Sequence, residues 1–164
     1  MNEADIEVRV RAILDDLAIP YEMVPIDPAF ADTAAFCERY GFPLDRSVNT
    51  IVVASKKEPK QYAACAVLAT TRLDVNHTVK KLMGVSRLSF ADARETTTLT
   101  GMMIGGVTAL ALPADLPLYV DARLMAPDWI ILCSGSRSSK IKTSPEIFRR
   151  LPNTQIVPGL TTPA

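Results

Sequence analysis

Residues 48–70, "VNTIVVASKKEPKQYAACAVLAT", contain two apolar segments joined by a charged turn. The first segment, residues 48–55, is rich in β-branched side chains, and the second, residues 62–70, combines small apolar residues with an aromatic one. Segments of this kind, separated by the polar connection "KKEPKQ", predict a β-hairpin. A β-sheet is therefore the starting point for predicting the fold.

Helical patterns lie on both sides of this hairpin. Residues 3–18 carry apolar side chains at helical spacing and end before Pro20, and residues 32–41 begin at a capping aspartate and end at a glycine. Three further helices are predicted over residues 74–84, 91–101 and 144–152. Other strands are predicted in residues 21–26, 116–122, 128–135 and 153–158. Five helices scattered among about seven strands predict an α+β fold with a mixed sheet.

The chain of 164 residues is predicted to form a single domain over residues 1–164, with an N-terminal helical segment at 1–19 and a frayed tail at 159–164. The hydrophobic fraction of 48% argues against disorder. The longest apolar run, residues 101–112, is too short to span a membrane, and the N-terminus does not resemble a signal peptide. We therefore expect a cytoplasmic protein that does not bind membranes.

The charge distribution is uneven although the formal net charge is zero. Residues 1–45 have a balance of −7, from ten acidic and three basic side chains, and residues 46–164 have a balance of +7, from fifteen basic and eight acidic ones. A basic body of this kind permits an anionic partner without requiring one.

The residues that usually carry metal or nucleophilic chemistry are sparse. Cys37, Cys65 and Cys133 are far apart and form no CxxC pair, so we expect three buried, unpaired thiols. The only histidine, His77, has no hydrolase signature around it and is expected at the surface of a helix. We predict no metal site and no cofactor.

One loop and one apolar segment stand out as candidates for a site. Residues 134–142 combine Gly135, Arg137, Lys140 and Lys142 with four serines, which is either a phosphate-contact surface or a solvated basic loop. The apolar segment 100–112, "TGMMIGGVTALAL", is interrupted by two adjacent glycines, which weaken helices and strands alike. We expect core sheet as far as Ile104, followed by a glycine pair that serves either a close backbone approach or a bulge or turn for packing.

Four segments of the chain resemble the YbaK/EbsC family, the free-standing relatives of the editing domain inserted in bacterial prolyl-tRNA synthetases. They are "IDPAFADTAAFCERYGFPLDRSVNTIVV", "LATTRLDVNHTVKKLMG", "LTGMMIGGVTALALPADLPLYVDARLM" and "WIILCSGSRSSKIKTSPEIF", within roughly residues 20–150. The most specific feature is T-G, three apolar residues and G-G, followed by L-P-x-Y-V-D and a later S-G. The resemblance implies a mixed, curved and barrel-like sheet surrounded by helices.

The resemblance also implies an activity, the hydrolysis of the ester that joins a wrong, small amino acid to the 3′ end of a tRNA. Such an ester is already activated, so a positioned water and amides facing the oxyanion can suffice. The implied catalytic residues are Asn49, Gly105 and Gly106. The implied substrate-binding residues are Thr50, Val107, Thr108, Ser134, Gly135 and Ser136. Arg137, Lys140 and Lys142 are the expected tRNA-binding residues, and a monomer or weak dimer acting on tRNA, with no role for DNA, is expected.

This chain departs from the family pattern at four positions. Asn49 stands where the family usually has a lysine, and Ala109 replaces a proline. Ser136 replaces the second glycine of S-G-G, and Ile26 replaces a histidine. Asparagine offers only neutral hydrogen bonds, which are about half as strong as charge-assisted ones. Three functions stay open: a deacylase, a non-catalytic homologue that binds tRNA or a synthetase, and a repurposed small-molecule-binding domain.

Overall fold

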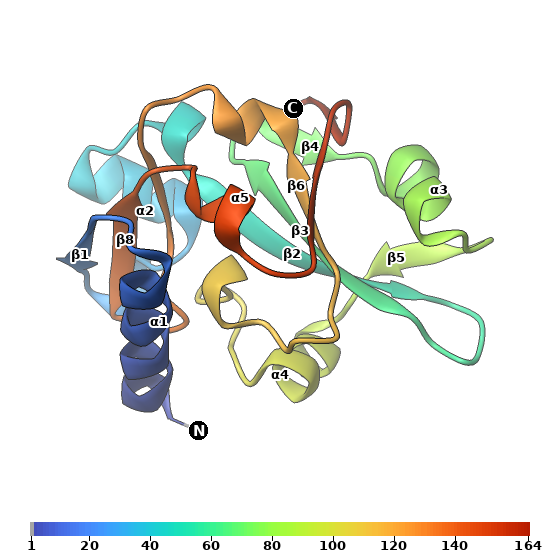
Figure 1. The fold of residues 1–164 in the computed structure, drawn as a ribbon, viewed down its shortest axis with the longest axis horizontal. Helices are drawn as coiled ribbons and strands as arrows, with labels where there is room; N and C mark the ends of the chain where they lie inside the picture. The colour runs from blue at the N-terminus through green and yellow to red at the C-terminus, as the bar shows by residue number, and fades with distance from the viewer. Residues whose placement is uncertain (1) are drawn as a thin grey trace.

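Two antiparallel strands, β2 (Val48–Ser55) and β3 (Tyr62–Leu68), form the hairpin at the centre of the largest sheet. The structure is a computed structural model that describes residues 2–164 (Figure 1), so Met1, the first residue of the predicted 1–19 helical segment, lies outside it. Val48 pairs with Leu68 and Ala54 with Tyr62. The predicted hairpin is therefore confirmed.

The hairpin belongs to a five-stranded sheet with the order β5-β2-β3-β6-β9. Strands β3, β6 and β9 are parallel, whereas β2 runs antiparallel to both of its neighbours, so the predicted mixed sheet is confirmed. The three other strands of this sheet are β5 (Leu88–Phe90), β6 (Leu118–Asp121) and β9 (Thr154–Val157).

Two smaller sheets complete the fold. One is antiparallel with the order β1-β8-β7, and the other pairs β10 with β4. Their strands are β1 (Tyr21–Pro25), β4 (Thr71–Leu73), β7 (Ile130–Cys133), β8 (Ser139–Thr143) and β10 (Thr161–Pro163). Ten strands in three sheets over residues 2–164 replace the predicted seven, and the sheets do not close into a barrel.

Four strands were missed because their sequences are short and interrupted by polar residues. β4 is "TRL", β5 is "LSF", β8 is "SKIKT" and β10 is "TTP", so none shows an apolar run. The predicted frayed tail at 159–164 is wrong, since Thr161 pairs with Leu73. The predicted basic loop at 134–142 is wrong in its second half, where β8 joins β1 to β7.

Three helices begin and end within two residues of the predicted bounds, whereas the α-helices observed within 74–84 and 144–152 are shorter than predicted. The helices are α1 (Glu3–Leu17), α2 (Thr33–Tyr40), α3 (Lys80–Met83), α4 (Ala93–Thr100) and α5 (Ile147–Arg150). α1 and α4 begin at capping boxes, and α2, α3 and α4 end at glycines with positive φ. Residues Val75–Val79 form a π-helical turn that leads into α3. None of the helices between residues 2 and 164 is long and apolar enough to cross a membrane.

The five-stranded sheet is buried on both faces, which explains its apolar strands. Along β3, Ala64 and Ala66 contribute to a core that contains α1 and α5, while Cys65 and Val67 point into a second core beside α3. This alternation follows from the period of two residues in a strand. Ala64 and Cys65 are both fully buried.

Helix α1 contributes to the larger core through Ile6, Val10 and Leu14, as its helical spacing predicted. Substitution of Leu14→Ala should lower the free energy of unfolding by about 3 kcal/mol, because a fully buried leucine leaves a cavity. Val8 lies on the same helix but is 69% exposed, so Val8→Ala should change stability by less than about 0.5 kcal/mol. Urea unfolding followed by circular dichroism measures both values, and equal effects would contradict the packing of α1.

Candidate functional site

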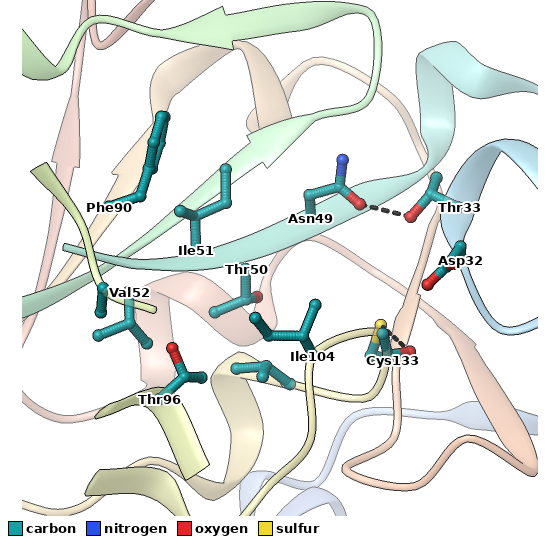
Figure 2. A pocket seen from close by; sticks show the side chains of 13 residues that line it. Asp32, Thr33, Asn49, Thr50, Ile51, Val52, Phe90, Thr96, Ile104 and Cys133 are labelled. Atoms are coloured by element: carbon teal, nitrogen blue, oxygen red, sulfur yellow. Dashed lines mark hydrogen bonds between the residues drawn. The ribbon is translucent and has the colours of Figure 1, made fainter. Parts of the chain in front are cut away.

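A cavity of about 390 Å³ lies beside β2, between the start of α2 and the glycine-containing loop 101–107 (Figure 2). Its volume is in the range of small-ligand sites. The residues that line it come from β2, the start of α2, the segment 90–96, the loop after α4 and the end of β7, and they are Asp32, Thr33, Asn49, Thr50, Ile51, Val52, Phe90, Ala91, Thr96, Ile104, Gly105, Val107 and Cys133. The lining is therefore mainly apolar, with a few polar groups.

The first wall of the cavity is the edge of β2. Strand β5 pairs with β2 from Val53 onward, and the Ala91 amide donates to the Val52 carbonyl oxygen at 2.9 Å, so residues 49–51 lie beyond the paired part of that edge. The side-chain oxygen of Asn49 accepts a short hydrogen bond from the Thr33 hydroxyl, which ties β2 to the first turn of α2 (Figure 2). Thr50 lines the cavity next to Asn49.

The second wall is the loop that follows α4, where the prediction of core sheet up to Ile104 is wrong. Gly101 ends α4 with a φ of 75°, and residues 102–107 form turns and irregular backbone rather than a strand. Met102 is buried, whereas Met103 and Ile104 are more than half exposed. An apolar sequence alone does not distinguish a strand from a loop that covers a core and lines a cavity.

Arg137 links the loop of the second wall to the segment that precedes α2. Its Nη1 donates to the Ile104 carbonyl oxygen at 2.8 Å, and its Nη2 donates to the Pro28 carbonyl oxygen at 3.2 Å. Nη1 also lies 3.5 Å from an Asp32 carboxylate oxygen. The guanidinium thus joins the loop before α2 to the loop after α4.

The same bridge explains why residue 105 is a glycine. Gly105 has a φ of 93°, and a Cβ at this position would collide with Nη1 of Arg137. The residue therefore meets two requirements that a side chain would violate, a left-handed backbone and a close approach to the guanidinium. No group in the described chain accepts the amide hydrogen of Gly105 or of Val107.

Gly106 has a different role from the one predicted. Its N–H donates to the Met103 carbonyl oxygen at 2.8 Å, so this amide closes a turn and is not available to a ligand. A Cβ at Gly106 would lie 3.2 Å from the backbone of Ser136, which shows how tightly the two loops pack. Gly106 does not line the cavity.

The predicted residues Ser134, Gly135 and Ser136 lie behind the cavity and not in its wall. Ser134 is fully buried, and its hydroxyl donates to the Ser139 carbonyl oxygen at 3.0 Å. A Cβ at Gly135 would collide with Ile6 of α1. Thr108 is also fully buried and accepts from the Leu110 amide, as a helix cap. These residues therefore pack behind the cavity and hold the loops that line it in place.

The predicted tRNA-binding cations are all engaged by the protein. The Lys140 ammonium is buried, donates to the Ala31 carbonyl oxygen at 2.8 Å and lies 3.4 Å from the Cys133 sulfur and 5.1 Å from the Phe36 ring centroid. No carboxylate within residues 2–164 pairs with it. The Lys142 ammonium packs over Trp129.

The position of Lys140 matters because Cys133 lines the cavity. The Cys133 sulfur faces the Gly105 carbonyl oxygen at 3.6 Å on one side and the Lys140 ammonium on the other. A buried positive charge therefore lies directly behind the cavity wall. In a weakly solvated site, such a charge stabilises negative charge that develops nearby.

Four of the predicted site residues meet at the cavity, namely Asn49, Thr50, Gly105 and Val107. Sequence reasoning missed the side chains from α2 and from the segment 90–96, because nothing in the sequence brings residues 32, 90 and 133 together. The three predicted unpaired thiols are confirmed as buried, and burial raises the pKa of Cys65 to about 12. No group of three or more His, Cys, Asp or Glu side chains in the described range could hold a metal ion.

One family model and two solved structures resemble this chain. Residues 27–151 match the model of a family described as the aminoacyl-tRNA editing domain. The crystal structure of the hypothetical protein APE2540 superposes with a TM-score of 0.82 at 21% identity, covering 94% of this chain and 99% of that one. A protein described as a candidate trans-editing enzyme for prolyl-tRNA synthetase superposes with a TM-score of 0.78 at 20% identity, covering 97% and 98%. At such identities, the two superpositions show the shared fold.

The close approach of the Arg137 guanidinium to Gly105 leads to a prediction about stability. Gly105→Ala should lower the free energy of unfolding by about 2 kcal/mol, from backbone strain and from displacement of the guanidinium. In an Arg137→Ala background, the same substitution should cost only the strain, about 1 kcal/mol. A double-mutant cycle by urea unfolding measures the difference, and additive effects would show that the two residues do not meet.

Proposed function

Because the chain belongs to the family of aminoacyl-tRNA editing domains, we propose that it is a trans-editing deacylase that hydrolyses the ester of a small, mischarged amino acid on a tRNA of the tRNA(Pro) type. The observation that carries this proposal is the cavity between the β2 edge and the Gly105 loop. It lies within the matched residues and joins an apolar pocket to free amides and a buried cation. The similarity to a candidate trans-editing enzyme for prolyl-tRNA synthetase supports the choice of tRNA.

The proposed chemistry uses a water molecule as the nucleophile. Water attacks the ester carbonyl carbon, the carbonyl oxygen becomes an oxyanion, and the bond to the ribose oxygen then breaks, with the proton passing to that oxygen. The unused amides of Gly105 and Val107 are the proposed donors to the oxyanion. Neither a metal ion nor a covalent intermediate is needed, because an ester already has a good leaving group.

Lys140 supplies the charge that the proposed mechanism needs. An oxyanion in contact with the Cys133 sulfur would lie roughly 7 Å from the ammonium, since that sulfur is 3.4 Å from Nζ. At this separation, and with an effective dielectric constant of about 20, the attraction is about 2 kcal/mol. Lys140, which lies behind Cys133, thus provides the positive charge for the oxyanion that Asn49 cannot provide.

The apolar side chains of the cavity are the proposed filter for the amino acid. Ile51, Val52 and Val107 narrow the space between β2 and the Gly105 loop. One additional methylene changes binding by only about 1–3 kcal/mol, so a pocket of this kind selects mainly by excluding large side chains. The proposed substrates are therefore small amino acids attached to the tRNA.

The experiment is hydrolysis of a panel of mischarged tRNAs by the purified protein, including alanyl-, cysteinyl- and seryl-tRNA(Pro). We expect turnover of at least one of them, and no turnover of prolyl-tRNA(Pro). Absence of turnover across the panel, with tRNA binding retained, would reject catalysis. It would favour a non-catalytic homologue, for which the lack of a cation at position 49 gives a chemical reason.

The role of Lys140 yields a prediction with an internal control. Lys140→Met should lower kcat about 30-fold, because it removes the buried charge while keeping a similar volume. Lys142→Met, two residues along β8, removes a charge that packs over Trp129 and should leave kcat within about twofold. Single-turnover hydrolysis gives both values.

Two further measurements separate electrostatics from folding. The melting temperature of Lys140→Met should stay close to that of the wild type, because removal of the buried charge offsets the loss of the hydrogen bond to the Ala31 carbonyl oxygen. Adding Asn49→Lys should restore part of the lost kcat, because a cation at position 49 also reaches the cavity. Loss of activity that follows loss of stability, without rescue, would reject the assigned role.

A further inference from the structure

Cationic side chains lie near the C-terminal end of β2 and the N-terminal end of β5, which are paired with each other. Residues 56–87 contain seven cations and only two acidic residues, Glu58 and Asp74. Lys60 forms an ion pair with Glu95, but in the described part of the chain none of the other six cations is paired with a carboxylate. These six are Lys56, Lys57, Arg72, Lys80, Lys81 and Arg87.

Three of these cations line one hollow, which we call the basic hollow. It has a volume of about 430 Å³ and is lined by Lys56, Asn76, Lys80, Ser86, Arg87 and Leu88. The Lys56 amide donates to the Arg87 carbonyl oxygen at 3.1 Å, which fixes the end of β2 beside the start of β5. A second hollow, which shares Ser86 and Arg87 with the first, adds Lys57.

The chemistry of the basic hollow suits phosphate groups. Lys and Arg side chains, together with neutral donors such as the Asn76 amide and the Ser86 hydroxyl, are the groups that proteins use to contact nucleic-acid backbones. Lys56, Asn76, Ser86 and Arg87 are exposed, so a large polyanion can reach them.

The basic hollow and the cavity lie along the same two paired strands, β2 and β5, which are seen side by side in Figure 1. Arg87 directly precedes β5, and Phe90, at the other end of β5, lines the cavity. Three residues of strand span roughly 10 Å. At about 3.4 Å per stacked nucleotide, this distance corresponds to roughly three nucleotides of a single strand. Phe90 is 57% exposed, so its ring is accessible for stacking with a base at the cavity.

We propose that the basic hollow binds the sugar–phosphate backbone of RNA a few nucleotides before the 3′ end that enters the cavity. This inference rests on the proposed function, since it takes the terminal nucleotide to lie at the cavity. It moves the RNA-binding surface away from residues 134–142, where Lys140 is buried and Arg137 is bound to carbonyl oxygens.

The test is the salt dependence of tRNA binding. A Lys56→Gln, Lys80→Gln, Arg87→Gln variant removes three phosphate contacts, and each contact contributes about 0.7 to the slope of log K against log salt for a single strand. The slope should therefore fall by about 2, and affinity at 0.1 M salt should fall about 100-fold. Filter binding of uncharged tRNA between 50 mM and 200 mM salt measures both quantities.

The matched control is Arg11→Gln, Arg123→Gln, Arg149→Gln, which removes the same net charge from three other elements. The control should keep the wild-type slope and affinity within about threefold. Equal losses in the two variants would overturn the proposal, as would competition by polyglutamate as effective as that by RNA of the same charge.

Deacylation assays keep this inference distinct from the proposed function. If both hold, the basic-hollow variant should have a raised KM and an unchanged kcat on a mischarged tRNA. Turnover with a wild-type salt slope in that variant would reject the RNA surface and leave the deacylase standing. Reduced tRNA binding by the variant, in a protein that hydrolyses no mischarged tRNA, would reject the deacylase and support the surface.

Discussion

The arrangement of the site depends on one guanidinium, that of Arg137. It bonds to the carbonyl oxygens of Pro28 and Ile104 and lies against Asp32, so it fixes the loop before α2 to the loop after α4. Gly105 has no side chain where the guanidinium crosses it. The bridge therefore holds the Gly105 loop, one wall of the cavity, against the segment that leads into α2.

The elements of the fold were predictable where periodicity or capping was strong. The β2–β3 hairpin and the helices with aspartate and glycine at their ends could be read from the sequence, because these signals are local. Strands such as "TRL" and "TTP" were not, because their pairing depends on the tertiary fold and not on their own side chains. The segment 100–104 was misassigned as strand because a loop that covers a core is as apolar as a strand.

The candidate site was only partly predictable for a similar reason. Asn49 and Gly105 could be named from motifs, but Lys140 was expected on the surface and is in fact buried behind Cys133. No sequence pattern indicates that a lysine on β8 takes a position beside the cavity. In the proposed function, the buried lysine stabilises the oxyanion of the reaction. The cations near Arg87 bind the phosphates of the RNA.

The central claim is that the cavity receives the aminoacylated 3′ end of a tRNA. Its most direct test is an NMR titration of the protein with a non-hydrolysable, amide-linked 3′-alanyl-adenosine analogue. The account predicts that the largest amide shift changes occur at Asn49, Thr50, Gly105 and Val107, the predicted residues that line the cavity. Binding that leaves these amides unchanged and shifts residues elsewhere would contradict the account.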